Sequence, residues 1–249
     1  MDRQNLERYI KNYISELNHE IAQPILERDT QQVKIDSAKV FFLLLPLLNG
    51  ERWTAEMNTS AIAVGAVHVA FDAHDLIDRN DATSRQQQLT VLSGDYYSGI
   101  HYKLLASMSD FSFVKTLSTA IGRINEVKTE FYGRTPSTSK QLMDTVQIIE
   151  SGCIVEFLRT FGFSRYAPLA ELALPLLRID KNRTSNKSLV TKQTIHSDYG
   201  WNENVDIVEQ LTSELEVKLF EALNEANFIE PFLKEEIRGM MTPLLGKPI

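Results

Sequence analysis

His74-Asp75-Leu76-Ile77-Asp78 closes a long apolar stretch, and Val91-Leu92-Ser93-Gly94-Asp95-Tyr96-Tyr97 follows it after a polar segment. Asp75 and Asp78 are three positions apart, so on a helix both carboxylates lie on one face. Carboxylate oxygens are the ligands that Mg²⁺ prefers, whereas the imidazole of His74 suits softer transition metals. The stretch therefore predicts a helix that ends in a weakened site for a hard metal ion. The alternative is a polar helix turn with two surface carboxylates.

Apolar residues recur at helical spacing through most of the chain, and no long strict alternation occurs. One helix is expected to begin near Asp36-Ser37, with Asp36 as its N-cap, and another to run from about Thr59 to Asp78. We therefore predict an all-α, single-domain helical bundle over residues 1–249. A polar loop is expected at about 180–204, before C-terminal helices at 205–245.

Composition excludes several classes of protein. The balance of 26 basic and 33 acidic residues argues against a nucleic-acid surface. The longest apolar run, Val40 to Leu48, is far shorter than the ~20 residues of a membrane span. The single Cys153 and the absence of a charged-then-apolar leader make a reducing cytoplasm the expected location.

The Gly94-Asp95 pair has a physical rationale in a helical bundle. Glycine lets a neighbouring helix approach closely, and the Asp95 carboxylate is then expected to face the same cavity as Asp78. Tyr96 and Tyr97 begin an apolar and aromatic face beside it, which belongs either to the core or to a helix-helix interface. The alternative for Asp95 is an ordinary exposed helix position.

The segment from Val69 to Tyr97 resembles the trans-isoprenyl diphosphate synthases, in which a D-D-x-x-D motif precedes a helix with Gly-Asp-Tyr. More specifically, the chain resembles the small subunit, component 1, of the heterodimeric heptaprenyl diphosphate synthases of Gram-positive bacteria. The stretch Ile124-Asn125-Glu126-Val127-Lys128 looks like that subunit's Asn-Glu-x-Lys helix. The resemblance implies the all-α isoprenoid synthase fold. It also implies that His74, Asp75 and Asp78 are a vestigial diphosphate or metal motif.

Departures from the catalytic pattern separate this chain from active synthases of the family. Where these carry Gly-Lys-Arg-x-Arg-Pro, the chain has Asp36-Ser37-Ala38-Lys39-Val40-Phe41. Where those synthases show an Arg-Arg-Gly loop after the first motif, Ala82-Thr83-Ser84-Arg85-Gln86-Gln87 has a single arginine. The region of the second D-D-x-x-D, around Leu176 to Lys181, retains one carboxylate. Stabilising a leaving diphosphate requires several preorganised cations and metals at once, so no catalytic residue is expected here.

The resemblance therefore implies a non-catalytic subunit that pairs with a homologous catalytic chain carrying two D-D-x-x-D motifs. In such a complex the catalytic partner holds most of the Mg²⁺, and Asp75 and Asp78 are the ligands on this chain if it binds any. The substrates implied are farnesyl and isopentenyl diphosphate, and the product supplies the menaquinone side chain. The contact between the chains is expected on the segments 89–105 and 116–132. The isolated chain could also form a homodimer.

Two other functions stay open on the sequence. One is a self-sufficient enzyme of the same fold, in which His74, Asp75, Asp78 and Asp95 hold a transition metal. The other is a helical adaptor whose aspartates are only surface residues.

Overall fold

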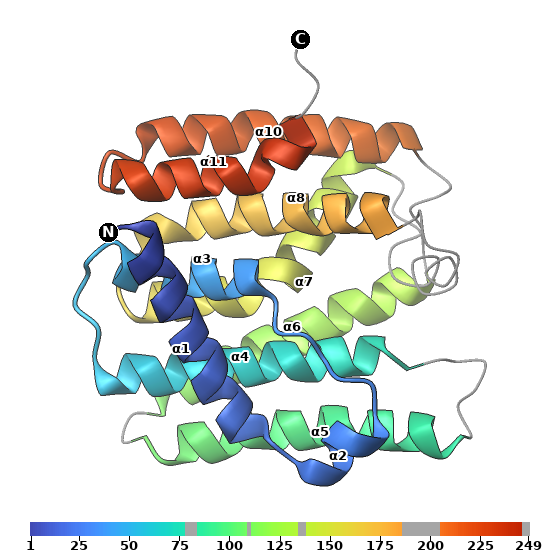
Figure 1. The fold of residues 1–249 in the computed structure, drawn as a ribbon. Helices are drawn as coiled ribbons and strands as arrows, with labels where there is room; N and C mark the ends of the chain where they lie inside the picture. Colours follow the sequence, from blue (N-terminus) through green and yellow to red (C-terminus); the bar gives the residue numbers. More distant parts are fainter. Residues whose placement is uncertain (78–83, 109–110, 134–137, 186–204, 246–249) are drawn as a thin grey trace.

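The computed structural model describes residues 1–77, 84–108, 111–133, 138–185 and 205–245, and these ranges contain helices but no strand (Figure 1). The all-α prediction is therefore confirmed. The helices are α1 (Arg3–Ile21), α2 (Pro24–Asp29), α3 (Ser37–Leu48), α4 (Ala55–Asp75), α5 (Arg85–Ala106), α6 (Ser112–Gly133), α7 (Ser139–Thr160), η1 (Ser164–Tyr166), α8 (Ala167–Ser185), α10 (Val205–Glu225) and α11 (Pro231–Leu245).

Helix α3 lies in the interior because it is apolar on almost every side. Phe41, Phe42 and Leu45 are fully buried, and α1, α4, α7 and α8 all pack against this helix. Its start is fixed by Asp36, whose Oδ1 accepts hydrogen bonds from the backbone N–H groups of Ala38 (2.9 Å) and Lys39 (3.4 Å). The predicted N-cap is therefore confirmed.

Helices α4 and α5 lie side by side along one edge of the bundle, and α1 runs diagonally across both in Figure 1. α4 begins at Ala55, four residues before the expected start at Thr59, because Thr54 caps it by accepting from the N–H of Met57. α4 ends at Asp75. Asp78 lies outside the described residues.

The C-terminal helices α10 and α11 lie beside α8 at the opposite edge of the bundle from α5 (Figure 1). The expected polar loop begins later than 180, because α8 continues to Ser185. Lys181 and Arg183, which lie in this last part of α8, are good helix formers and need no burial. The rest of the expected loop, 186–204, lies outside the described residues.

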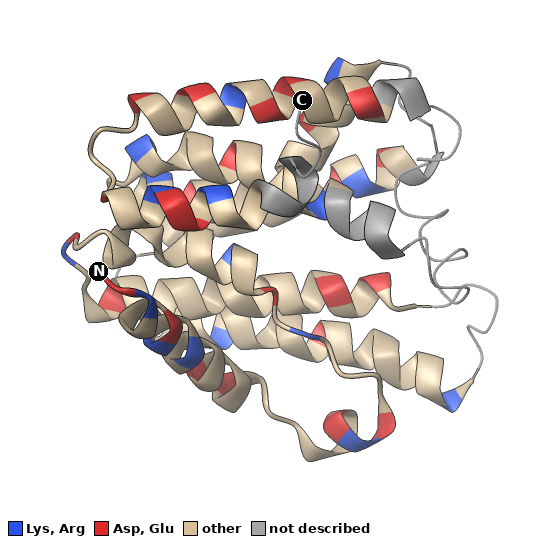
Figure 2. Cartoon of the chain, turned by 45° about the horizontal axis from the view of Figure 1, so that its top comes forward, with Lys and Arg blue, Asp and Glu red and all other residues tan. Residues whose placement is uncertain are grey.

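One contiguous apolar core draws side chains from α1, from α3 to α8 and from α10 and α11. Charged residues lie mostly on the outer helices, and α1, which begins at N in Figure 2, carries both signs along its length. Within the described ranges, no helix combines the length and the apolar character that crossing a bilayer requires.

Candidate functional site

The candidate site lies where the end of α4 meets α5 and α6. α4 contributes His74 and Asp75, α5 contributes Gly94 and Asp95, and α6 contributes Lys128. Of the predicted site residues, His74, Asp75 and Asp95 lie here together with Lys128 of the Asn-Glu-x-Lys stretch, whereas Asp78 lies outside the described residues.

The imidazole of His74 lies directly over Gly94. A Cβ atom on Gly94 would lie only 2.6 Å from His74 Nε2, closer than real Cβ contacts, so any larger residue must displace the ring. His74 Nε2 lies 3.9 Å from Asp95 Oδ1, and the Asp95 side chain is 69% exposed. The sequence predicts that this glycine lets a neighbouring helix approach closely. The prediction is confirmed, because Gly94 makes room for the His74 side chain of α4.

The carboxylate of Asp75 is occupied by a cation of the same chain. Lys128 Nζ donates to Asp75 Oδ1 across the α4–α6 contact, and the two side chains are only 14% and 20% exposed. The ammonium also lies 5.6 Å from the ring centroid of Phe71. Because a charge-assisted hydrogen bond with little water around it is strong, Lys128 competes with a metal ion for this carboxylate.

Tyr96 and Tyr97 pack toward the N-terminal part of the chain. Tyr96 OH donates to the carbonyl of Ala22 (3.3 Å), and Tyr97 is buried in the apolar core, where burial raises the pKa of its hydroxyl. Tyr96 and Tyr97, the first two residues of the predicted aromatic face, therefore contribute to packing between α5 and the end of α1.

A second charged cluster lies deeper in the bundle, between α3, α7 and α8. Glu150 on α7 is 4% exposed, and its carboxylate faces two cations: Lys39 Nζ at 3.1 Å and Arg178 Nε at 3.5 Å. Burial alone would lower the pKa of Lys39, but Glu150 and Asp72 raise it by more, so the ammonium stays charged. We call Lys39, Glu150 and Arg178 the buried ion cluster.

Asp72 and His68 extend the buried ion cluster along α4 toward the first motif. Burial raises the pKa of Asp72, and Lys39 opposes that rise. Burial, reinforced by Lys39, lowers the pKa of His68 to about 3, so this imidazole is neutral. Both side chains line a cavity of about 20 Å³ together with Lys39 and Tyr13.

These residues do not fit a Mg²⁺ site of the kind that the fold family implies. Mg²⁺ needs hard oxygen ligands with free lone pairs, but Asp75 is paired with Lys128 and Glu150 with Lys39 and Arg178. Within the described parts of the chain, no three His, Cys, Asp or Glu residues are grouped so that they could hold a metal ion. No chemical step is therefore assigned to a metal ion bound by the described residues.

Sequence reasoning missed the buried ion cluster. Its signal was present, because Glu150, Lys39 and Arg178 each stand beside apolar residues at positions that helical periodicity assigns to the interior. A charge in such a place requires a partner, but the identity of the partner depends on how α3, α7 and α8 pack.

Comparison with known proteins identifies the family of this chain. Residues 23–227 match the family model described as heptaprenyl diphosphate synthase (HEPPP synthase) subunit 1. The chain belongs to this family. A curated family member, heptaprenyl diphosphate synthase component 1 of Geobacillus stearothermophilus, is 29% identical over 125 residues, which are 50% of this chain. The match spans 57% of that relative's length.

Solved structures support the fold. Octaprenyl pyrophosphate synthase from Helicobacter pylori matches with a TM-score of 0.63 at 15% identity, over 97% of this chain and 100% of that chain. Heptaprenyl diphosphate synthase from Staphylococcus aureus matches with a TM-score of 0.60 at 11% identity, over 98% and 93%. The subunit 1 chain therefore has the helical fold of prenyl diphosphate synthases, as predicted.

Proposed function

We propose that this chain is the non-catalytic subunit of a heteromeric long-chain all-trans polyprenyl diphosphate synthase, needed for activity and for product length. A homologous catalytic subunit with two D-D-x-x-D motifs would hold Mg²⁺ and ionise the allylic diphosphate. The substrates would be farnesyl and isopentenyl diphosphate, and the heptaprenyl product would supply the menaquinone side chain. The family match and the synthase fold support a place in such a complex.

The observation that carries the non-catalytic role is the pairing of Asp75 with Lys128. In a synthase of this fold a carboxylate at the end of this helix must offer its oxygens to a metal, because the metal neutralises the leaving diphosphate. Here the ammonium of Lys128 already neutralises the Asp75 carboxylate. In the buried ion cluster, Lys39 and Arg178 neutralise Glu150 in the same way.

An exposed apolar face supports assembly with a partner. Val91, Leu92 and Tyr102 lie on the outer side of α5, and Phe111 precedes α6; Leu92 is 57% and Phe111 65% exposed. Between them, Gly99 leaves the α5 surface bare, with no atom within 4 Å of where its Cβ would lie. Obligate interfaces are apolar at their centre, so we assign the contact with the catalytic subunit to this α5 face (Val91, Leu92 and Tyr102).

A prenyltransferase assay tests the proposal. Labelled isopentenyl diphosphate, farnesyl diphosphate and Mg²⁺ are given to this chain alone, to the catalytic subunit alone, and to the mixture. We expect long-chain product only from the mixture. Product from this chain alone would overturn the proposal in favour of a self-sufficient enzyme, and a mixture that neither binds nor reacts would favour the adaptor.

A further inference from the structure

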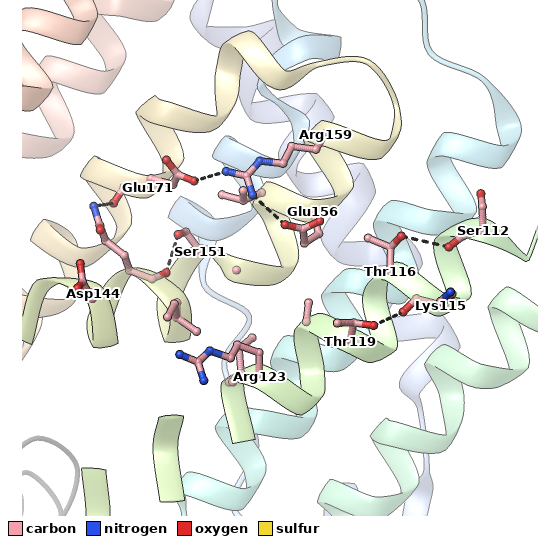
Figure 3. Close-up of a pocket in the computed structure, with 16 residues that line it drawn as sticks. Ser112, Lys115, Thr116, Thr119, Arg123, Asp144, Ser151, Glu156, Arg159 and Glu171 are labelled. Carbon is pink, nitrogen blue, oxygen red and sulfur yellow. Dashed lines mark hydrogen bonds and ion pairs between the residues drawn. The ribbon is translucent and has the colours of Figure 1, made fainter. Parts of the chain in front are cut away.

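A groove of about 1020 Å³ lies between α6 and α7 (Figure 3). Its α6 wall carries the cations Lys115 and Arg123, and its other wall carries the carboxylates of Asp144, Glu156 and Glu171 with the guanidinium of Arg159. That guanidinium lies 2.9 Å from Glu156 and 3.0 Å from Glu171, so two of the three carboxylates share a cation of the same chain (Figure 3). These charges do not identify an occupant, whereas the lining of a smaller cavity in the interior does.

The small cavity, of about 20 Å³, lies between α1, α3 and α4, beside the buried ion cluster. Part of its wall is aliphatic and includes Leu17, Leu43 and Val69. The polar residues that line it are Tyr13, Asp36, Lys39, His68 and Asp72. A cavity needs at least about 10–15 Å³ and two to four polar groups to hold a water molecule, and this cavity has both.

His68 is the residue of this lining that most needs a further partner. It is 7% exposed, and its Nε2 atom is buried with no hydrogen-bond partner among the described residues. A buried polar atom that stays unpaired destabilises the folded state. The imidazole is neutral, because burial and Lys39 lower its pKa to about 3, so Nε2 either donates or accepts one hydrogen bond. A water molecule suits both cases, since it donates as well as accepts.

Other polar groups of the lining can hold the same water molecule in place. Tyr13 OH donates to the carbonyl of Ala61 (2.7 Å), so the lone pairs of its oxygen can still accept. Lys39 has three N–H groups, and Glu150 lies 3.1 Å from its Nζ atom on one side only. The carboxyl group of Asp72 supplies a further acceptor. The lining therefore offers both donors and acceptors.

We propose that an ordered water molecule occupies this cavity, bonds to His68 Nε2 and links α4 to Tyr13 of α1 and Lys39 of α3. A cation in the same place would lie beside the Lys39 ammonium, and an anion would lie beside Asp36 and Asp72. A neutral ligand is therefore favoured, and the cavity is too small for one much larger than water. Asp36 is only partly buried, so solvent can reach the cavity from its side. The water extends the buried ion cluster to His68.

A crystal structure of the full chain, at a resolution that shows ordered water, tests the inference. We expect a density peak within hydrogen-bond distance of His68 Nε2 and of at least one of Tyr13, Lys39 and Asp72. In crystals of His68→Leu the peak should lose most of its height. His101→Leu is the matched control and should keep the peak, because His101 is also buried (2% exposed) but does not line the cavity. A cavity without density, or a peak that scatters anomalously after soaking in rubidium or bromide, would overturn the inference.

Thermal denaturation adds a test in solution. Val40 lines the cavity from α3 and is 3% exposed, so Val40→Ile places a methyl group where the water would lie. We expect this change to lower the melting temperature of the wild type and of His101→Leu by the same amount, because His68 loses its partner. In His68→Leu the methyl group fills a hole that lacks this polar atom and should not lower the melting temperature.

Two results of these melts contradict the inference. A rise in melting temperature when Val40→Ile is made in the wild type would show that the cavity is dry. An equal fall in all three backgrounds would show crowding in place of a lost hydrogen bond to His68. Circular dichroism spectra confirm that each variant is folded before it is melted.

Discussion

Lys128 on α6 donates a hydrogen bond to Asp75 on α4, and so joins the Asn-Glu-x-Lys helix to the remnant of the first aspartate motif. Two stretches that were separate signals in the sequence thus form one contact. The lysine stabilises the carboxylate that a catalytic chain would give to a metal.

Removing either member of this pair is expected to destabilise the fold. Lys128→Met or Asp75→Asn should each lower the free energy of unfolding by about 1–3 kcal/mol, because the remaining polar group is largely buried. The double variant should cost less than the two single changes together, since it leaves no unpaired charge. Urea denaturation measures all three. Lys103→Met, in an exposed pair with Glu20, is the control and should change little. Strict additivity of the single changes would contradict the pairing.

Added Mg²⁺ is expected to leave the thermal stability of the isolated chain unchanged. A ligand that binds only the folded state raises the melting temperature, but Asp75 and Glu150 already have protein cations as partners. Differential scanning fluorimetry of this chain with and without millimolar Mg²⁺ and inorganic diphosphate checks the point. A saturable rise in melting temperature that Asp75→Asn removes would show that the motif still binds metal.

Substitution of Gly94 tests the contact with His74. Gly94→Ala should be about 1 kcal/mol less stable than the matched variant Gly99→Ala, because the new Cβ forces the partly exposed imidazole of His74 out of its place. Gly99→Ala is the matched control on the same helix, with nothing near its Cβ, and should stabilise by up to about 1 kcal/mol through helix propensity. Adding His74→Ala to Gly94→Ala should restore much of the loss. Equal effects at the two glycines would rule out the steric explanation.

The buried ion cluster should be sensitive to loss of its central carboxylate. Glu150→Gln leaves Lys39 and Arg178 facing a neutral amide, and breaking a buried pair in this way typically costs about 3–5 kcal/mol. Chemical denaturation and near-ultraviolet circular dichroism report the loss. Glu126→Gln, whose side chain is 67% exposed, serves as the control. A Glu150 variant as stable as this control would mean that the cluster contributes nothing to the fold.

His68 should make the protein less stable in mild acid. Its pKa is about 3 in the folded chain against 6.5 for the free side chain, so between these values the unfolded chain binds a proton that the folded chain does not. The free energy of unfolding therefore falls as the pH is lowered through this window, by up to about 1.4 kcal/mol per pH unit. In His68→Leu this component should be absent. Urea titrations of both proteins at pH 7, 6 and 5 give the comparison, and parallel pH curves would contradict it.

The confirmed predictions concern helix ends that are fixed by side chains close to them in the sequence. Asp36 caps α3 because its side chain reaches N–H groups two and three residues ahead. The misplaced ends have local reasons too. α4 begins before Thr59 because Thr54 caps it, and α8 continues past residue 180 through Lys181 and Arg183, which are good helix formers.

The sequence by itself determined that this chain is an all-helical relative of prenyl diphosphate synthases with an incomplete aspartate motif, because periodicity, caps and motif spacing are written along the chain. Only the tertiary structure decided which cations of the chain pair with the remaining carboxylates. Lys128 is 53 positions from Asp75, and Lys39 meets Glu150 across the bundle. Such pairs depend on which faces of distant helices meet, and no local rule of sequence states that. The opposite charges of the α6–α7 groove likewise exist only once the two helices lie side by side.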